Sequence, residues 1–409
     1  MKGLLLAIGD FPEGNATATR LRLIARALDI GGAPVNVALL QPTLKKPVEE
    51  NAAVSGNVDG VDFVYLSGNT VRPSGLVPAF MDTWRGIVGA ARVLMAMNAD
   101  REIDYLLLYT PSFLKHGVPL LVARILGIPV FVEACEVRSK ATGGSKRHLV
   151  GRLLNFSERL MEFLVPRIAK GVIPISEGIA LYYRNKGLEG ERIFMLPILT
   201  DVKLYSFPVS QEVPQLSGIR FFLNSGSFVE KDGVAYIVEA FIKVCRQRDD
   251  VYLAFTGNVS AGDQRRVLEA MKAAGLGGRV IFVGLLSRRE LVWAYQNAVG
   301  LLCCRTSSVY AGLGFPTKLG EYLASGTPVI VTRVGDVDRY LRHQDSALIA
   351  EPESVESIAS CMQFVLDDSD RAAEIGAAGQ KVAERCFHFE SHAGPLARFI
   401  SSRIGEVRQ

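Results

Sequence analysis

Short apolar runs alternate with longer amphipathic stretches along the whole chain, and the runs predict β-strands. In the first half these runs are Gly3–Ile8, Val35–Leu40, Val61–Tyr65, Tyr105–Tyr109, Pro129–Val132 and Gly171–Ile175. In the second half they are Arg220–Leu223, Val251–Thr256, Val280–Val283, Gly300–Cys303 and Pro328–Thr332. Strands with so few polar residues are typical of parallel sheets that helices cover on both faces.

The stretches between these runs predict the covering helices. Ala16–Asp29 places Leu21, Ile24, Ala25 and Leu28 on one face, and Ser176 is a candidate N-cap for a helix that ends near Lys186. Other expected helices are Lys115–Leu126, Leu149–Ala169, Val234–Arg246, Gln264–Ala274, Glu290–Gln296 and Lys318–Ala324.

A stretch with three prolines and little periodicity, Pro197–Gly218, separates two α/β halves of similar size. We therefore expect an α/β protein of two Rossmann-like domains, residues 1–203 and 204–385, whose parallel sheets face each other across a cleft. In open parallel sheets the carboxyl ends of the strands carry the ligand site.

Length and composition agree with this organisation. The 409 residues suggest about two domains, and 49% hydrophobic residues exclude a disordered chain. The net charge of +4 argues against a nucleic-acid-binding protein. The six cysteines form no Cys-x-x-Cys pair, which favours neither a zinc site nor a disulfide framework. The apolar stretch Leu76–Met97 is interrupted by charges, so we expect a cytoplasmic protein without a membrane span.

The loop Gly9–Asn15 follows the first strand and precedes a helix, where backbone N–H groups can meet an anion. It lacks the Gly-x-Gly-x-x-Gly spacing, and Gln41-Pro42 stands where a dinucleotide-binding domain has an acidic residue. The pattern thus disfavours a nicotinamide-dependent dehydrogenase and leaves an ordinary βα loop as the alternative.

Two further segments combine glycines with basic residues. Gly226–Gly233 places Lys231 at a strand-to-helix turn, where its ammonium is either a diphosphate contact or a solvated loop lysine. In Phe315–Val329, Pro316 suits a helix start, and the N–H groups of Thr317, Lys318 and Leu319 then form an anion site. Glu321, one turn further, can accept hydrogen bonds from a sugar diol, or is simply an exposed glutamate on a capped helix.

Glu321 to Val329 reproduces the pattern Glu-(Tyr/Ala)-(Leu/Met)-Ala-x-Gly-x-Pro-Val and resembles the donor-site helix of the family-four retaining glycosyltransferases (glycosyl transferases group one). Lys231–Val234 with Glu239–Phe241 and Ile281–Gly284 with Tyr295 are similar to other segments of that family. At the amino end, the stretch from Pro12 to Arg20 is similar as well. The resemblance covers nearly the whole chain and implies the GT-B fold.

The resemblance also implies site roles. Glu321 would bind the ribose of a nucleotide-sugar donor, and Lys231 would face its diphosphate with support from Gly226, Ser227 and the first turn at Thr317, Lys318 and Leu319. Gly284 and Leu285 would contact the base. The loop with Gly14 would close over the leaving group, and Glu136 on the acceptor side would be catalytic together with Lys231 and Glu321.

Three positions depart from the family pattern. Leu313 replaces a glutamate that contacts the transferred sugar, Ser227 stands near a usual basic residue for which Lys318 is a substitute, and Cys135-Glu136 replaces a His-Asp pair.

The expected activity is metal-independent retaining transfer of a hexose from a UDP- or GDP-linked sugar, without a further cofactor, in cell-surface polysaccharide or glycolipid assembly. The acceptor would be a carbohydrate or a lipid-linked sugar. A nucleotide-sugar-binding protein without turnover and a GT-B phosphosugar epimerase or phosphorylase are the alternatives.

Two surface features remain open. A basic cluster either attracts anionic lipid, which implies peripheral membrane association, or is a solvated face; it consists of Arg138, Lys140, Lys146, Arg147, His148, Arg152 and Arg159. For the amphipathic tail 386–409 the resemblance implies a helix that crosses back to the first domain; the alternative is a closing helix on the second.

Overall fold

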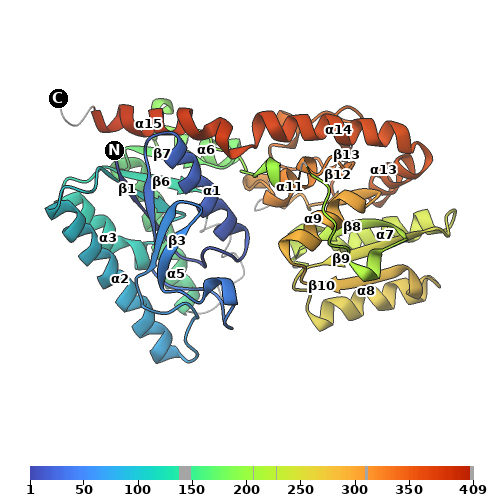
Figure 1. The fold of residues 1–409 in the computed structure, drawn as a ribbon, viewed down its shortest axis with the longest axis horizontal. Coiled ribbons are helices and arrows are strands. Elements are labelled where there is room, and N and C mark those ends of the chain that lie inside the picture. The colour runs from blue at the N-terminus through green and yellow to red at the C-terminus, as the bar shows by residue number, and fades with distance from the viewer. Residues whose placement is uncertain (138–148, 206, 227, 309–311, 406–409) are drawn as a thin grey trace. The chain divides into compact units, whose positions relative to one another are not determined.

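The computed structural model describes residues 1–137, 149–205, 207–226, 228–308 and 312–405. The chain divides into two compact units (Figure 1). One unit comprises Met1–Leu199 with Phe389–Gln409, and the other comprises Thr200–His388. The first unit therefore ends at Leu199, within the proline-containing stretch and a few residues before the domain boundary that the sequence predicts after residue 203. The chain returns to the first unit after residue 388.

The first unit is built on a seven-stranded sheet of order β3-β4-β2-β1-β5-β6-β7. Its strands are β1 (Gly3–Ala7), β2 (Val35–Leu39), β3 (Ser55–Val58), β4 (Val61–Tyr65), β5 (Tyr105–Tyr109), β6 (Val130–Ala134) and β7 (Gly171–Pro174). All neighbours are parallel except β3, which pairs antiparallel with β4. Without β3 this is the strand order of a doubly wound fold.

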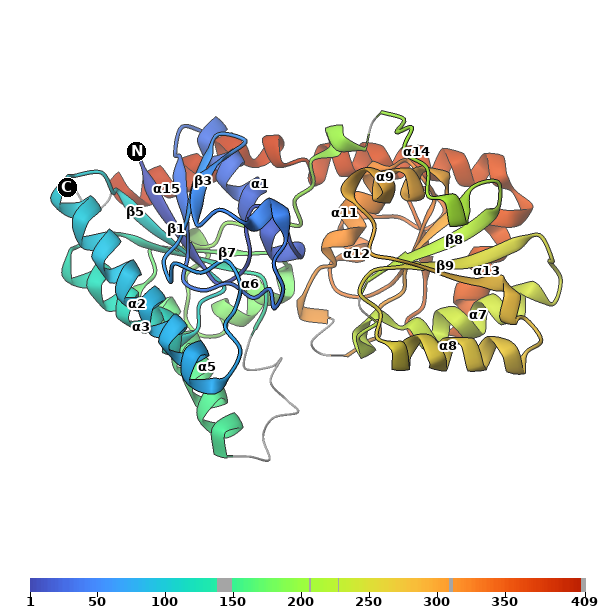
Figure 2. The same cartoon turned by 60° about the horizontal axis from the view of Figure 1, so that its bottom comes forward.

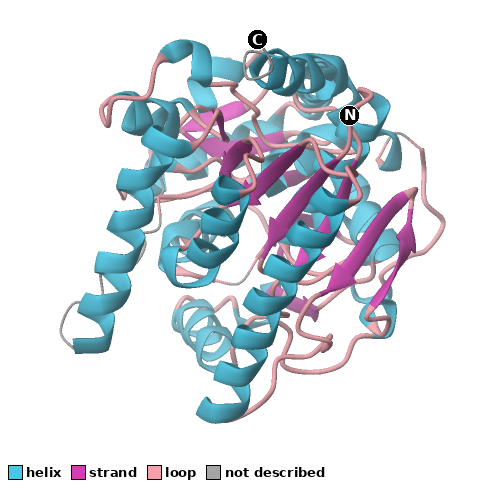
Figure 3. Ribbon diagram, turned by 90° about the vertical axis from the view of Figure 1, so that its left-hand side faces the viewer, coloured by secondary structure: helices cyan, strands magenta, loops and turns pink. Residues whose placement is uncertain are grey.

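Helices cover both faces of this sheet, which explains its apolar strands. They are α1 (Ala16–Ile30), α2 (Leu76–Ala99), α3 (Phe113–Ile125), α5 (Leu149–Ile168), α6 (Glu177–Arg184) and α15 (Ala393–Gly405). Leu5 and Leu107 pack with α1 and α15 in one core, and the alternate residues Leu4 and Leu106 are fully buried on the other face. Figure 3 shows helices in front of and behind the magenta strands.

The second unit repeats this plan with a six-stranded, all-parallel sheet of order β10-β9-β8-β11-β12-β13. Its strands are β8 (Arg220–Ser225), β9 (Val251–Thr256), β10 (Val280–Gly284), β11 (Gly300–Cys303), β12 (Val329–Thr332) and β13 (Leu348–Ala350). Its helices are α7 (Val234–Cys245), α8 (Ala261–Ala273), α9 (Arg288–Asn297), α11 (Thr317–Ala324), α12 (Val337–Tyr340), α13 (Val355–Asp367) and α14 (Ser369–Cys386).

The final helix belongs to the first unit. Leu396, Ile400 and Ile404 of α15 join the core that contains α1, and Phe399 stacks on Phe194 with ring centroids 5.4 Å apart. Gly171 makes room for this ring, because a Cβ there would lie 2.6 Å from Phe399. These contacts place the apolar stripe of the tail in the core of the first unit.

A buried ion pair joins α1 to β6 in the first unit. Arg20 Nε lies 2.6 Å from Glu133 Oε1, and both side chains are almost fully buried. The Arg20 guanidinium also donates to the carbonyls of Pro197 and Leu196, at 2.7 and 2.9 Å. Arg20 therefore connects α1 to β6 and to the segment around Pro197, where the chain leaves the first unit.

Replacing Arg20 with Met removes this charge and leaves the Glu133 carboxylate buried without its cation. We expect the free energy of unfolding to fall by about 3–5 kcal/mol, measured by urea denaturation. Arg184→Ala is the matched control because its pair with Glu177 is also 2.6 Å long but exposed, so it should cost about 1 kcal/mol or less. Equal losses in the two variants would contradict the role of the buried pair.

Candidate functional site

The loops that follow β8, β9 and β10 meet at one edge of the second sheet. The Gly226 N–H donates to the Thr256 carbonyl at 2.9 Å, and the Gly257 N–H donates to the Gly284 carbonyl at the same distance. Gly257 has a φ of 127°, and a Cβ there would lie 2.2 Å from the Gly226 carbonyl oxygen. Only glycine permits this approach, which brings Gly226 and Gly284 to one edge.

Lys318 reaches this edge from the first turn of α11. Its ammonium Nζ donates to the Ser225 carbonyl at 2.6 Å and lies 3.8 Å from Asp232 Oδ1. A Cβ on Gly226 would lie only 2.8 Å from Nζ. The positive charge of Lys318 is therefore held directly beside the glycine loop after β8, where the sequence predicted a basic residue.

Lys231 lies in the short 3-10 helix Glu230–Asp232, within the same β8–α7 loop. Its carbonyl accepts a hydrogen bond from the Thr306 N–H at 3.0 Å, which ties the loop to the segment after β11. Gly233 follows with a φ of 63°, and a Cβ there would lie 2.0 Å from the Cys304 carbonyl oxygen. The backbone of Lys231 is directly followed by Asp232, the residue whose carboxylate lies near the Lys318 ammonium.

The first turn of α11 differs in one respect from its expected form. The Leu319 N–H donates to the Pro316 carbonyl at 3.0 Å, and the Leu319 side chain is fully buried. Of the N–H groups that the sequence assigned to an anion, that of Leu319 thus already has a partner within the turn. Thr317 and Lys318 are the remaining residues of this expected donor set.

Glu321 lies one turn into α11, partly open to solvent but crowded by protein. Burial raises the pKa of its carboxyl to about 7, against the opposing charges of Arg288 and Lys318 and a hydrogen bond with Tyr295. A carboxyl with this pKa changes charge near neutral pH. It can accept hydrogen bonds from a diol when ionised.

Three tyrosines surround this carboxyl. Tyr295 stands edge-on to Tyr322 with ring centroids 4.9 Å apart and is stacked with Tyr205 at 6.3 Å. The Ser225 N–H donates to the Tyr322 hydroxyl oxygen at 2.8 Å. Burial raises the pKa of all three hydroxyls, so they stay neutral. The packing of these tyrosines and the hydrogen bond from Ser225 to Tyr322 hold α11 against the end of β8.

Sequence reasoning missed part of this neighbourhood. The sequence identified Tyr295 only as part of a family pattern. Arg288 begins α9 next to Arg289, and the sequence alone does not show which of the two arginines lies near the site. Arg305, directly after β11, is buried and donates from Nη1 to the Gly314 carbonyl at 3.4 Å. Such residues come together only through the fold.

The other expected donor residues have different environments. Leu285 follows Gly284 and is 77% exposed, as a residue that stacks on a planar ligand would be. Leu313 is partly buried in the segment before α11. Ser227 and the basic residues Arg138, Lys140, Lys146, Arg147 and His148 lie outside the described residues.

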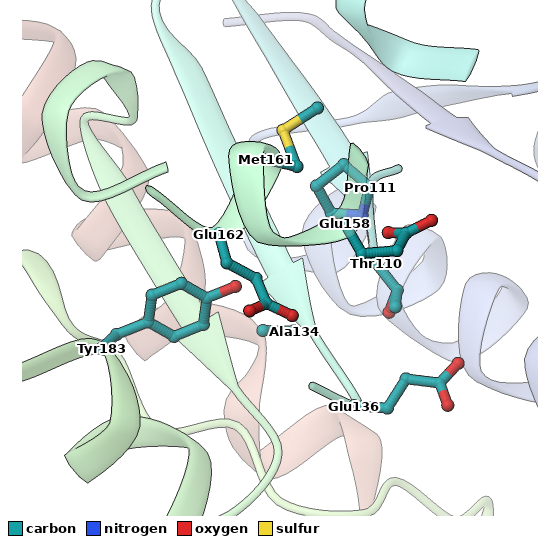
Figure 4. Close-up of a pocket in the computed structure, with 8 residues that line it drawn as sticks. All are labelled: Thr110, Pro111, Ala134, Glu136, Glu158, Met161, Glu162 and Tyr183. Carbon is teal, nitrogen blue, oxygen red and sulfur yellow. The ribbon is translucent and has the colours of Figure 1, made fainter. Parts of the chain in front are cut away.

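Gly14 and Glu136 belong to the first unit, at the carboxyl edge of its sheet. Gly14 lies in the loop after β1, and Glu136 follows β6. Glu136 lines a small hollow that is partly open to solvent (Figure 4). Its other lining residues are Thr110, Pro111, Ala134, Glu158, Met161, Glu162 and Tyr183.

Three carboxyl groups thus meet at this hollow, from β6 and from α5. Glu158 and Glu162 are each only 6% exposed, and the Tyr182 hydroxyl donates to Glu162 Oε2. The sequence predicted Glu136 but not the two glutamates of α5, since they lie on a helix whose pattern predicts only a buried face. Ionised carboxylates of this kind accept hydrogen bonds from N–H and O–H groups.

The described residues contain no group of three or more His, Cys, Asp or Glu that is arranged to hold a metal ion. The chain contains two Asp-x-Asp sequences, Asp336–Asp338 at the start of α12 and Asp368–Asp370 at the start of α14. In the first of them the Asp338 carboxylate pairs with Arg333 at 2.5 Å.

Both halves of the chain match known protein families. Residues 15–198 match the glycosyl transferase 4-like domain, and residues 210–382 match glycosyl transferases group 1. A GDP-mannose-dependent alpha-(1-6)-phosphatidylinositol monomannoside mannosyltransferase of Mycobacterium tuberculosis is 28% identical over 176 residues, 42% of this chain and 45% of that protein. The chain spans less than half the length of the first curated relatives that it matches.

Solved structures share the fold over the whole chain. A sucrose-phosphate synthase from Thermosynechococcus elongatus superposes with a TM-score of 0.73 at 18% identity, covering 99% of this chain and 100% of that one. HepE of Anabaena, solved in complex with UDP, superposes with a TM-score of 0.71 at 16% identity, covering 98% and 100%. With two doubly wound units and matches to both halves, the chain has the GT-B fold and belongs to the glycosyl transferases group 1 family.

Proposed function

We propose that this protein is a glycosyltransferase that moves a hexose from a nucleoside-diphosphate sugar to an acceptor hydroxyl with retention of configuration. The observation that carries the proposal is the Lys318 ammonium, fixed 2.6 Å from the Ser225 carbonyl beside the glycine loop and one turn before Glu321. A cation for a diphosphate and a carboxylate for a diol thus lie on one helix.

Each group has a defined role in this proposal. Lys231, Lys318 and the amino end of α11 at Thr317 offset the charge of the diphosphate, most strongly as the leaving group develops negative charge. Glu321 accepts hydrogen bonds from the two ribose hydroxyls. The base lies against Gly284 and Leu285. UDP and GDP are the candidate nucleotides, since HepE was solved with UDP and the mycobacterial relative uses GDP-mannose.

The transfer itself needs positioning more than a strong base. The bond between the anomeric carbon and the diphosphate oxygen breaks, and the acceptor oxygen bonds to that carbon on the same face. The acceptor proton passes to the departing phosphate oxygen, so the phosphate acts as the base. The protein supplies preorganised positive charge and orientation, which together can account for most of the rate enhancement.

In this proposal the acceptor approaches the carboxyl edge of the first sheet, next to Glu136, which follows β6. Glu136 stands where the family pattern has an acidic residue, although Cys135 replaces the preceding histidine. In this proposal Glu136 positions the acceptor.

A second candidate function is a nucleotide-sugar-binding protein that has lost turnover. Leu313 favours it, because an apolar side chain replaces the glutamate that contacts the transferred sugar in the family pattern.

A screen of UDP-, GDP- and ADP-linked sugars by thermal shift tests the proposal. A ligand that binds only the folded protein raises its melting temperature by mass action, and we expect one nucleotide class to do so. The ligands that bind are then assayed for transfer and for hydrolysis. Binding without either reaction across many acceptors supports the second candidate, and no shift with any nucleotide sugar contradicts both.

Removing the charge of Lys231 should slow the reaction. We expect Lys231→Met to lower kcat by roughly 10²–10³-fold, the cost of losing one electrostatic contact to the leaving group. Lys243→Met is the matched control, because Lys243 is an exposed lysine of α7 in the same unit and pairs with Glu356. A Lys231 variant as active as the control would remove this lysine from the mechanism.

The pKa of Glu321 predicts how donor affinity depends on pH. Since the carboxylate accepts the diol and its pKa is raised to about 7, affinity should fall as pH drops through that value. A sugar nucleotide is the right probe, because its diphosphate diester does not titrate in this range. Between about pH 8 and about pH 6 we expect roughly a tenfold rise in Kd, measured by calorimetry.

Glu321→Gln should abolish this pH dependence and weaken donor binding at all pH values, whereas Glu239→Gln, an exposed position on α7, should preserve both. A Glu321→Gln variant that keeps the wild-type pH profile would show that another group titrates.

A further inference from the structure

Three helices of the first unit form a continuous outer layer on one side of its sheet. Helix α2 contacts α3, and α3 contacts α5. Figures 1 and 2 show α2 and α3 side by side, and the contacts of α3 with both α2 and α5 place it between them. The outer faces of these helices therefore make up one surface, which we call the α2–α3–α5 surface.

This surface exposes large apolar side chains at helical spacing. On α2, Phe80 and Trp84 are 67% and 51% exposed and lie four residues apart. On α3 the corresponding residues are Leu121 and Ile125, and on α5 they are Phe156 and Phe163. Scattered apolar residues are ordinary on a protein surface, but a contiguous group of this kind marks an interaction site.

The charges on the same helices are sorted by sign. The exposed charged residues in the described parts of α2 and α5 are Arg85 and Arg92 on the former, and Arg152, Arg159 and Arg167 on the latter. The acidic residues of the three helices are Asp82, Glu158 and Glu162, and all are at least 94% buried. The surface is therefore apolar and basic, without an exposed carboxylate among these described residues.

On α5 the two kinds of residue alternate along one stripe. Arg152, Phe156, Arg159, Phe163 and Arg167 follow each other at intervals of three or four residues, so they share a face. The Arg167 guanidinium lies 3.6 Å from the centre of the Phe163 ring. This is the pattern of a helix that lies in a lipid interface, where rings enter the acyl boundary and arginines reach the headgroups.

We propose that the α2–α3–α5 surface docks on a bilayer that contains anionic phospholipids. Charge complementarity selects this occupant, because each basic residue near an anionic membrane adds binding free energy, while the aromatic and aliphatic side chains gain by leaving water. In the described part of the chain, no helix is long and apolar enough to cross a membrane, so the contact is peripheral.

This surface also bears on the acceptor. The buried face of α5 carries Glu158 and Glu162 at the hollow, while its exposed face carries the stripe of arginines and phenylalanines. A bilayer on the outer face brings lipid-linked sugars to the helix that lines the hollow. This step rests on the proposed function, whereas the docking itself does not.

Flotation of the full chain with vesicles tests the docking. We expect the protein to float with vesicles of phosphatidylcholine and phosphatidylglycerol in equal parts, and much less with phosphatidylcholine alone. The double variant Arg152→Gln with Arg159→Gln should bind the anionic vesicles about 30-fold more weakly, from the loss of two charges. Trp84→Ser with Phe156→Ser should weaken binding even where salt screens the charges.

One control removes the same number of positive charges elsewhere on the chain, and another removes an exposed apolar side chain outside the α2–α3–α5 surface. Arg265→Gln with Lys272→Gln, at exposed positions of α8, and Leu181→Ser, 52% exposed on α6, should bind vesicles like the wild type. Unchanged melting temperatures show that all variants fold. Donor binding by thermal shift, which should stay intact in every variant, separates failure of this inference from failure of the proposed function.

The same experiments give different results if the α2–α3–α5 surface does not bind anionic lipid. No flotation with anionic vesicles, or equal flotation with both lipid compositions, overturns the proposal. Self-association in light scattering that the Trp84 and Phe156 substitutions abolish, without any vesicle binding, would assign the surface to a second copy of this chain instead.

Discussion

A parallel strand that is buried on both faces can present polar groups only at its ends. This constraint governs both units, where strands such as β1 and β11 are fully buried along their length. Polar and charged residues that serve a ligand must therefore follow the strands, in the loops at the carboxyl edge and at the amino ends of the helices. In the second unit that edge holds Gly226, Gly284 and the first turn of α11.

Within that edge, the Lys318 ammonium links structure to the proposed chemistry. Its hydrogen bond to the Ser225 carbonyl fixes α11 against β8, and its charge stands beside the loop that carries Lys231. The same helix brings Glu321 among Tyr205, Tyr295 and Arg288. Because Tyr205 precedes β8 whereas Arg288 and Tyr295 lie on α9, the geometry depends on the packing of the unit.

Helix α5 has a comparable double role in the first unit. Its buried face is unusually polar for a core helix, with two glutamates at a hollow, and its exposed face is unusually apolar for a surface helix. The polar groups of the buried face are bonded within the unit, as where the Tyr182 hydroxyl donates to Glu162. The exposed face carries the apolar and basic residues on which the proposed docking rests.

The sequence by itself determined the α/β class, most strands and helices, and the family. It also identified Lys231, Lys318 and Glu321 as candidate site residues. These inferences were possible because hydrophobic periodicity and local motifs are properties of residues that are close together in the chain. It missed β3, whose residues are largely exposed, and the helical nature of α2, whose composition resembled an interrupted apolar stretch.

Only the tertiary structure decided that α15 joins the first unit, that the Leu319 N–H is already bonded, and that Arg288 and Tyr295 surround Glu321. It also revealed that the carboxyl groups of α5 face inward while its arginines face outward. These features depend on contacts between residues far apart in the chain, and no local pattern encodes which distant segments will pack together.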